Sequence, residues 1–212
     1  MKRIKIYTFY SKSHQEIYEN YFFKSFNENK LDMNFEIIPT EVIQRSQTGD
    51  FNSSGFNQTM NDKVQIIKGA LESEDIFIYA DCDIQFLENF YDDISQYISE
   101  DIDIVAQQDL GTICAGFMVI RSNERTKNLF NLISQKNYDY NDQIYINQHK
   151  NMVKYRLLPA DKYFTIGNAN GGRVWNGETN IKLPQNILVH HANFTIGKEN
   201  KIKLFEMIKN NK

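Results

Sequence analysis

The chain has 212 residues, of which 41% are hydrophobic and 13% aromatic, and its formal net charge is −3. This composition suits one globular domain with a core of ordinary size and excludes a disordered chain, which cannot carry so many aromatic residues. The slight acidity and the scattered Lys and Arg residues argue against nucleic acid as a partner, because such binding needs clustered basic residues.

The first forty residues predict a strand, a helix and a second strand. A β-rich alternation marks the first strand, formed by Ile4, Ile6, Thr8 and Tyr10. Ser13 can cap a helix whose apolar face comprises Ile17, Tyr18, Tyr21 and Phe22. The segment "NFEIIP" (34–39) then predicts the second strand, so a parallel strand–helix–strand crossover is expected.

A polar stretch follows and ends at a second helix. Residues 44–59 are rich in Gly, Ser and Asn and predict a long loop. Thr59 is the expected N-cap of a helix with an apolar stripe of Met60, Val64, Ile67 and Leu71. The strand 76–80 comes next. Ligands bind at the carboxyl ends of the strands in open α/β sheets, so the residues just after this strand are of special interest.

The remaining pattern continues the alternation of strands and helices. Further strands are predicted at 104–106, 114–120 and 187–190, and further helices at 124–134, 142–149 and 198–208. The sequence has neither an internal repeat nor a linker that would divide it. We therefore expect a single α/β domain over residues 1–212.

Two aspartates end the strand in "IFIYADCDIQF". Asp81 and Asp83 follow the apolar run 76–80 with one residue between them. Like charges this close repel each other unless a third group neutralises them. A carboxylate pair of this kind can hold a hard divalent cation, Mn²⁺ or Mg²⁺, and leave coordination positions for substrate phosphates.

Asp-x-Asp is a weak pattern alone, and the sequence contains a second example. Asp101 and Asp103 precede a predicted strand instead of following one, so they are expected at the opposite edge of the sheet.

A phosphatase with an Asp-x-Asp nucleophile would favour a Thr shortly after the pair on its first strand. Ile84 and Gln85 follow here, and two strands come first, which excludes that interpretation.

The segment "FIYADCDIQF" resembles the metal-binding signature of the nucleotide-diphospho-sugar transferases of the GT-A fold. Four other segments resemble family motifs in the same order: "IYTFYSKSH" (6–14), "CAGFMVIR" (114–121), "NDQIYIN" (141–147) and "HHANFTIGKENK" (190–201). The third is similar to the Asp-Gln motif of retaining galactosyltransferases and glycogenin-like enzymes. Two departures stand out, because Cys114 replaces a frequent Asn and the segment from His191 to Gly197 is longer than usual.

The resemblance implies a Rossmann-like GT-A domain with a mixed, mainly parallel central sheet flanked by helices. It implies a metal-dependent glycosyltransferase that moves a sugar from a nucleotide-diphosphate donor, a UDP-sugar by expectation, to an unknown acceptor hydroxyl with retention. Asp83 and Asp81 would hold the metal, with His191 as third ligand, although a histidine at a strand end can also be structural. His190 alternates to the opposite face, so only one of the two histidines should enter the site.

The resemblance also implies contacts to the donor and to the sugar. Donor contacts are expected from Thr8, Tyr10, Lys63, Asp81, Ala115, Gly116 and Lys198, with Lys201 as the alternative C-terminal lysine. Lys63 is equally compatible with a solvated surface position. Asp142 and Gln143 are expected near the anomeric carbon, although Asp142 also suits the first turn of a helix.

Other functions and the location of the protein also have to be considered. A non-catalytic nucleotide-sugar-binding or interaction module of the same fold stays open. A nucleotidyltransferase would normally carry a Gly-rich phosphate loop, which "TFYSKSH" lacks.

Cys82 and Cys114 fit neither a disulfide framework nor a zinc pattern. With no signal-peptide core and no run of membrane-spanning length in the sequence, we expect a cytoplasmic protein.

Overall fold

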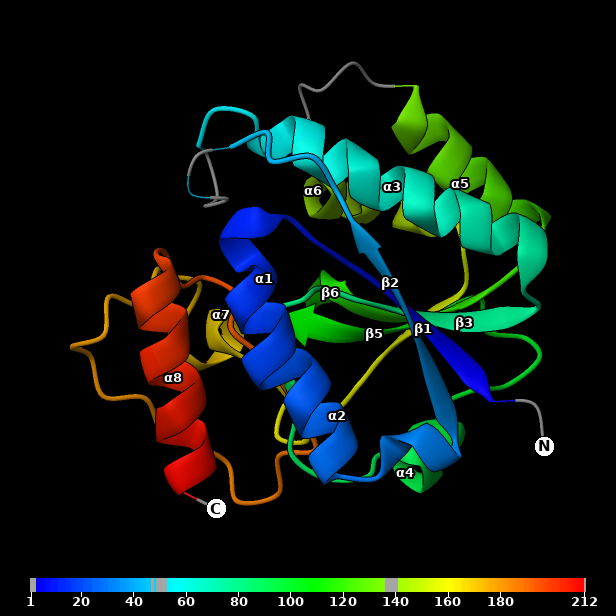
Figure 1. Ribbon diagram of the computed structural model, residues 1–212. Helices are drawn as coiled ribbons and strands as arrows, with labels where there is room; N and C mark the ends of the chain where they lie inside the picture. The colour runs from blue at the N-terminus through cyan, green and yellow to red at the C-terminus, as the bar shows by residue number, and fades with distance from the viewer. Residues whose placement is uncertain (1–2, 47, 49–52, 136–140, 212) are drawn as a thin grey trace.

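The computed structural model describes residues 3–46, 48, 53–135 and 141–211 (Figure 1). A six-stranded sheet with the order β2-β1-β3-β6-β5-β7 forms its centre. The strands are β1 (Ile4–Tyr10), β2 (Phe35–Glu41), β3 (Ile76–Ala80), β5 (Ile104–Asp109), β6 (Thr112–Arg121) and β7 (Tyr155–Leu157). β1 is parallel to β2 and β3, and β5 is parallel to β7, whereas β6 is antiparallel to both neighbours. The predicted mixed α/β fold is confirmed.

Helices cover both faces of this sheet (Figure 1). One face carries α3 (Phe56–Ser73), α5 (Glu124–Ser134) and α6 (Asp142–Gln148). On the other side a helical segment follows β1 and comprises η1 (Lys12–His14), α1 (Gln15–Ile17), η2 (Tyr18–Phe23) and α2 (Lys24–Glu28). The shorter elements are η3 (Leu31–Met33), α4 (Tyr91–Ser95), η4 (Lys150–Met152) and α7 (Ile166–Ala169), and α8 (Lys198–Asn210) ends the described chain.

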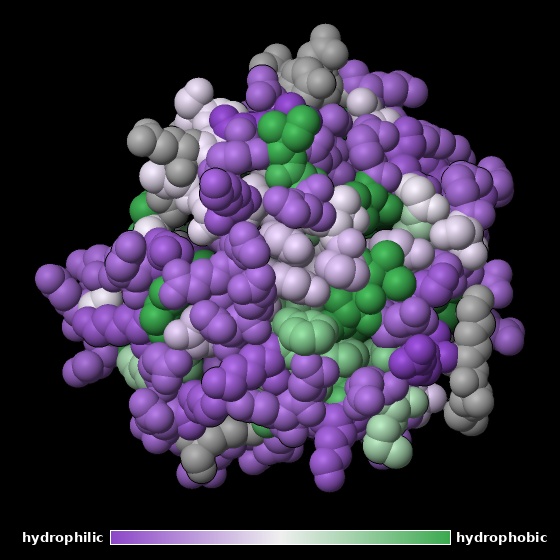
Figure 2. All heavy atoms as spheres, in the orientation of Figure 1, coloured by the Kyte–Doolittle hydropathy of each residue, from purple (hydrophilic) through white to green (hydrophobic). Residues whose placement is uncertain are grey.

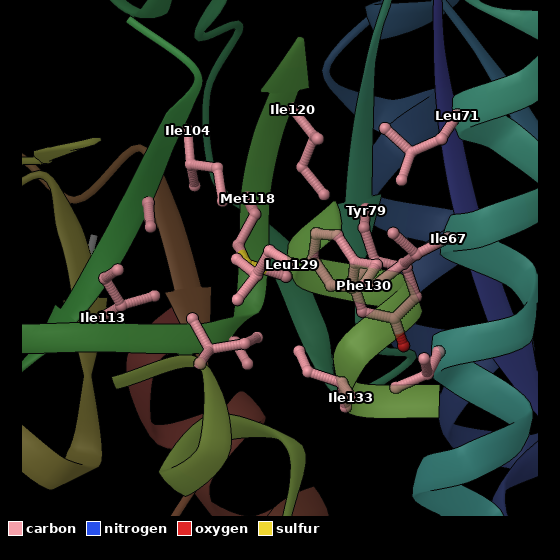
Figure 3. Packing of buried hydrophobic residues seen from close by; sticks show 14 of the residues in the cluster. Ile67, Leu71, Tyr79, Ile104, Ile113, Met118, Ile120, Leu129, Phe130 and Ile133 are labelled. Atoms are coloured by element: carbon pink, nitrogen blue, oxygen red, sulfur yellow. The ribbon is translucent and has the colours of Figure 1, made fainter. Parts of the chain in front are cut away.

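The sheet is buried on both faces because its strands alternate between two apolar clusters. In β3, Phe77 and Tyr79 join the cluster under α3 and α5, while Ile78 and Ala80 join the opposite one. Figure 3 shows the first cluster, in which Leu129 of α5 lies beside Met118 of β6 and Ile67 of α3 lies beside Tyr79 of β3. Because β1 and β3 pair in parallel, their carboxyl ends lie at the same edge of this buried sheet.

The starts of two helices differ from the prediction. Ser13 lies inside the first turn after β1, where its hydroxyl is 2.9 Å from His14 Nδ1, and Ser11 occupies the N-cap position. Helix α3 begins at Phe56, before the predicted cap Thr59, which lies inside the helix. The cause is Gly55, whose φ of 85° starts the helix and whose added Cβ would lie 2.3 Å from the carbonyl oxygen of Arg45. The predicted loop is therefore shorter, and its residues 47 and 49–52 lie outside the described part.

A second, three-stranded sheet forms beside the first. Its order is β4 (Ile84–Phe86), β9 (Val189–His191) and β8 (Tyr163–Thr165), with β9 antiparallel to β4 and parallel to β8. The strand predicted at 187–190 corresponds to β9, whereas β4 and β8 were not predicted from the sequence pattern. In this register His191 lies opposite Ile84, the residue that follows Asp83 in the sequence.

The surface fits a protein whose apolar residues are mostly inside. Figure 2 shows hydrophilic side chains over most of the face seen in Figure 1, with hydrophobic ones in small groups. Among the helices of the described residues, none has both the length and the apolar composition needed to cross a bilayer.

Candidate active site

A pocket of about 510 Å³ opens where β1 and β3 end. Its lining brings together residues that lie far apart in the sequence and that the family resemblance singles out: Tyr10, Lys63, Asp81, Asp83, Ala115, Gly116, Asp142, Gln143 and His191. The pocket has the size of a small-molecule site. The edge of the sheet that the sequence predicted for ligand binding is therefore hollowed and lined by charged groups.

Asp81, Asp83 and His191 form a group able to hold a metal ion. Each offers one ligand atom, and these atoms all lie within 4.8 Å of one another. His191 Nε2 is 3.2 Å from Asp83 Oδ1 and 3.8 Å from Asp81 Oδ2. Two carboxylates and one imidazole are a suitable donor set for Mn²⁺ or Mg²⁺, so the residues present fit the predicted metal.

Lysine side chains pair with the carboxylates of Asp81 and Asp83 and thereby offset their mutual repulsion. Lys201 Nζ lies 2.5 Å from Asp83 Oδ2. Lys63 Nζ lies 3.1 Å from Asp81 Oδ1 and 2.8 Å from Asp142 Oδ2. The Lys63 side chain is only 2% exposed, so the interpretation of Lys63 as a solvated surface residue is wrong. Its burial is possible because two carboxylates surround one ammonium group.

The pKa shifts agree with these ion pairs. Burial raises the pKa of the Asp83 carboxyl, but Lys201 and His191 outweigh it and hold that pKa well below its usual range. For Lys63, burial alone would lower the pKa, because it disfavours the charged ammonium group. The carboxylates of Asp142 and Asp81 outweigh this effect and raise the pKa of Lys63 above its ordinary value. Asp83 and Lys63 are therefore charged at neutral pH.

Gly116 makes room for the imidazole of His191. A Cβ added at Gly116 would lie 2.0 Å from His191 Cε1, a distance that no pair of carbon atoms tolerates. The resemblance implied a small residue here so that a sugar could approach. The structure adds a second reason, because the metal-ligand candidate itself occupies the space beside Gly116.

Gln143 is held in place by two hydrogen bonds. Its Oε1 accepts from the backbone N–H of Ala115 (3.0 Å), and its Nε2 donates to Asp109 Oδ2 (3.2 Å). Both Asp142 and Gln143 lie in the first turn of α6, whose N-cap Asn141 accepts from Ile144 N–H. Asp142 thus occupies the helix start that the sequence suggested and also pairs with Lys63 inside the pocket.

Sequence reasoning missed Asp109 and Asn193. Asn193 Nδ2 donates to both carboxylate oxygens of Asp109 at 2.9 Å, and Asn193 Oδ1 accepts from Gly167 N–H. Asp109 is the last residue of β5, which runs in the same direction as β3. The rule that ligand-binding groups follow the carboxyl ends of strands applied to Asp109 as well as to Asp81, and would have found it.

Two predicted donor contacts lie outside the pocket lining. Thr8 is fully buried in β1, and its Oγ1 has no hydrogen-bond partner among the described residues. Lys198 begins α8 and pairs with Glu16 at 2.9 Å, which keeps its ammonium group at the surface. Of the two C-terminal lysines, Lys201 lines the pocket and Lys198 does not. Tyr10 does line it, and its ring stacks on Tyr18 at 4.3 Å between centroids.

The structure separates the two neighbouring histidines from each other, and likewise the two Asp-x-Asp pairs. His190 points away from the site and is buried between Phe164 and Phe205, and this burial lowers its pKa to about 3. Asp103, from the second Asp-x-Asp pair, is buried outside the pocket lining and bonds to Arg125 at 2.7 Å. Position relative to a strand thus distinguished the two aspartate pairs correctly.

Comparison with known sequences supports the resemblance. A family model described as nucleotide-diphospho-sugar transferase matches residues 22–205. The UDP-galactose:fucoside alpha-3-galactosyltransferase of Dictyostelium discoideum is 28% identical over 194 residues, which cover 75% of this chain and 28% of that protein. The chain therefore spans less than a third of the length of this curated relative.

Comparison with solved structures supports the fold. A glycosyltransferase involved in the glycosylation of the major capsid of PBCV-1 has a TM-score of 0.66 and 14% identity, over 97% of this chain and 100% of that chain. Apo GlyE of Streptococcus pneumoniae TIGR4 has a TM-score of 0.61 and 14% identity, over 99% and 63% of the two chains. The galactosyltransferase LgtC, solved with donor and acceptor sugar analogs, has a TM-score of 0.55 and 9% identity, over 98% and 95%. These likenesses match the predicted GT-A fold.

Proposed function

The chain belongs to the nucleotide-diphospho-sugar transferase family, and on this premise we propose that it transfers a sugar from a nucleotide-diphosphate donor to an acceptor hydroxyl. The observation that carries the proposal is the pocket in which Asp81, Asp83 and His191 converge beside Asp142 and Gln143. A UDP-sugar is the proposed donor, and the name of the Dictyostelium relative makes UDP-galactose the first to test.

We propose that Asp81, Asp83 and His191 hold Mn²⁺ or Mg²⁺. When bound there, the ion acts as a Lewis acid on the diphosphate and stabilises the charge of the leaving group. The charges of the pocket support this. Three carboxylates (Asp81, Asp83 and Asp142) face the two lysines, so the group keeps one net negative charge when His191 is neutral. A divalent cation reverses that sign, which then favours an anionic diphosphate.

The residues near the reacting carbon are proposed to position it. The sugar develops oxocarbenium character as the glycosidic bond breaks. Gln143, whose amide group is held from both sides, is proposed to face the anomeric carbon as a positioning residue, with Asp142 beside it. Retention of configuration is proposed from the resemblance of Asp142–Gln143 to retaining enzymes, and the anomeric form of the product tests it.

Lys201 is proposed to contact the donor phosphates. Lys201→Ala should raise the donor KM about 10-fold, because a charge-assisted hydrogen bond contributes roughly 1.5–3 kcal/mol. Lys198→Ala is the matched control on the same helix and should stay within about twofold of wild type, since Lys198 pairs with Glu16 at the surface. Donor titrations at fixed Mn²⁺ measure both variants. A larger loss in Lys198→Ala would contradict the assignment.

An apolar rim on the pocket is proposed to receive the acceptor. Val174, Phe194 and Ile196 line the pocket yet are partly exposed, and a backbone bridge between Trp175 and Thr195 joins their two segments. Trp175 itself is buried and donates to Thr179 O, so it packs in the core. Phe194 has a φ of 49°, which bulky residues rarely adopt and which structures retain mainly at functional sites. A sugar ring offers a C–H face that can lie on such a surface.

Phe194→Ala should therefore weaken the acceptor and leave the donor unaffected. We expect a severalfold higher acceptor KM, with Mn²⁺-dependent donor hydrolysis within about twofold of wild type, since a stacking contact contributes roughly 0.5–1.5 kcal/mol. Phe23→Ala removes another exposed phenylalanine, one outside the pocket lining, and is the control. A methyl fucoside is the first acceptor to use, on the strength of the relative's name. An unchanged acceptor KM would contradict the assignment.

The test of the function as a whole is a panel of nucleotide sugars assayed for Mn²⁺-dependent hydrolysis and for thermal stabilisation. Hydrolysis or transfer that EDTA abolishes is the expected result. Stabilisation by a nucleotide sugar without any turnover would instead indicate a non-catalytic binding module.

We also propose that residues 1–212 form one glycosyltransferase domain. We propose in addition that this domain works in a reducing compartment such as the cytoplasm, as the free thiols of Cys82 and Cys114 suggest.

A further inference from the structure

A buried sulfur lies beside the imidazole of His191. Cys114 Sγ is 3.4 Å from His191 Nδ1, and the Cys114 side chain is fully buried in β6. Cys114 is also the position at which the sequence departs from the family pattern. The departure therefore touches the candidate metal site, although the contact joins residues that are 77 positions apart.

The two ring nitrogens of His191 face different partners. Nε2 faces the carboxylates of Asp83 and Asp81, at 3.2 and 3.8 Å, and Nδ1 faces the sulfur. A histidine binds a metal through the nitrogen that carries no proton, so binding through Nε2 requires the proton on Nδ1. Metal-binding histidines generally donate that second N–H to an acceptor that sets the tautomer and the orientation of the ring. Here the acceptor within reach is the sulfur atom.

The sulfur is itself held in place. Asn193 Nδ2 lies 3.8 Å from Cys114 Sγ and donates to both oxygens of the buried Asp109 at 2.9 Å. Gly116, two residues further along β6, supplies the space in which the ring of His191 lies against the strand. The imidazole is thus confined by the strand on one side and oriented by the sulfur on another.

We propose that Cys114 is a positioning residue that accepts a hydrogen bond from Nδ1–H of His191 and thereby directs Nε2 to the metal. The proposal rests on the proposed metal-dependent function. In it the thiol does not bind the metal; it replaces the oxygen acceptor that usually lies behind a metal-binding histidine.

The test measures Mn²⁺ affinity by electron paramagnetic resonance, in the absence of donor, for wild type, Cys114→Ala and Cys114→Ser. Cys114→Ala should bind Mn²⁺ about 10-fold more weakly, the lower end of what the loss of such partners costs. Cys114→Ser keeps an acceptor and should return to within about threefold of wild type. Wild-type affinity in Cys114→Ala, or equal losses in the two variants, would overturn the proposal.

Two controls separate this role from others. Val119→Ala, a buried change on the same strand, should lower thermal stability while leaving Mn²⁺ affinity within about twofold. Co²⁺ loaded into the wild type should show no sulfur-to-cobalt charge-transfer band, and such a band, if lost in Cys114→Ser, would make the thiol a direct ligand and overturn the proposal. Failure of wild type to bind Mn²⁺ at all would instead refute the metal-dependent function, which is a distinguishable result.

Discussion

Replacing Asp83 with alanine is expected to abolish Mn²⁺ binding and to reduce sugar transfer by roughly 10³-fold, because a bound metal ion contributes several kcal/mol to charge stabilisation in the transition state. Asp83 is the point where His191 and Lys201 meet, at 3.2 and 2.5 Å. Its loss removes a ligand and also leaves two basic groups without their shared counter-charge. Calorimetric titration with Mn²⁺ and an assay of donor consumption measure the two effects.

The second Asp-x-Asp pair supplies the control for this experiment. Asp101→Ala makes the same substitution at an exposed carboxylate and should leave both Mn²⁺ binding and transfer within about twofold of wild type. Asp83→Asn keeps the size of the side chain and separates loss of charge from loss of packing. A folded Asp83→Ala protein with wild-type Mn²⁺ affinity would rule out the proposed site.

Gly116→Ala is expected to lower Mn²⁺ affinity by about 10- to 100-fold, as misplacement of a metal ligand does. The new Cβ would lie 2.0 Å from His191 Cε1, so either the imidazole or strand β6 must move. Because β6 is hydrogen-bonded on both sides, we expect the imidazole to move and thermal stability to fall by about 1–3 kcal/mol. Mn²⁺ titration and thermal denaturation measure the two quantities.

Gly69→Ala is the matched control for that substitution. Gly69 lies inside α3, and no atom of the described residues comes within 4 Å of the position its Cβ would take, apart from its chain neighbours and helix backbone. Alanine favours helix interiors by about 0.5–1 kcal/mol over glycine, so Gly69→Ala should be neutral or slightly stabilising and keep its Mn²⁺ affinity. If Gly116→Ala also kept its affinity, His191 would not be held where the structure has it.

Much of the site's location followed from local patterns in the sequence. The apolar run 76–80 had to be a buried strand, and Asp81 and Asp83 follow it directly, so the carboxylates had to lie at the carboxyl edge of the sheet. The same reasoning distinguished them from Asp101 and Asp103. Local alternation also separated His190 from His191, because successive residues of a strand point to opposite faces.

Other features depended on how distant segments meet, which periodicity does not encode. Lys63 lies on an amphipathic helix, where the sequence allowed a surface position. Only the packing of α3 against both β3 and α6 surrounds it with Asp81 and Asp142. Lys198 and Lys201 lie on one helix three residues apart, and the docking of α8 decides that the second faces Asp83 while the first meets Glu16.

Hydrophobic periodicity and the order of the elements can be read along the chain, and they were enough to predict the alternation of strands and helices and the edge at which two carboxylates emerge. The groups that complete the site come together through long-range contacts. Two three-residue strands, β4 and β9, pair over about a hundred residues of chain and bring His191 to Asp83. The absent side chain of Gly116 and the sulfur of Cys114 then determine where its ring can lie, through contacts that exist only after the sheets have formed.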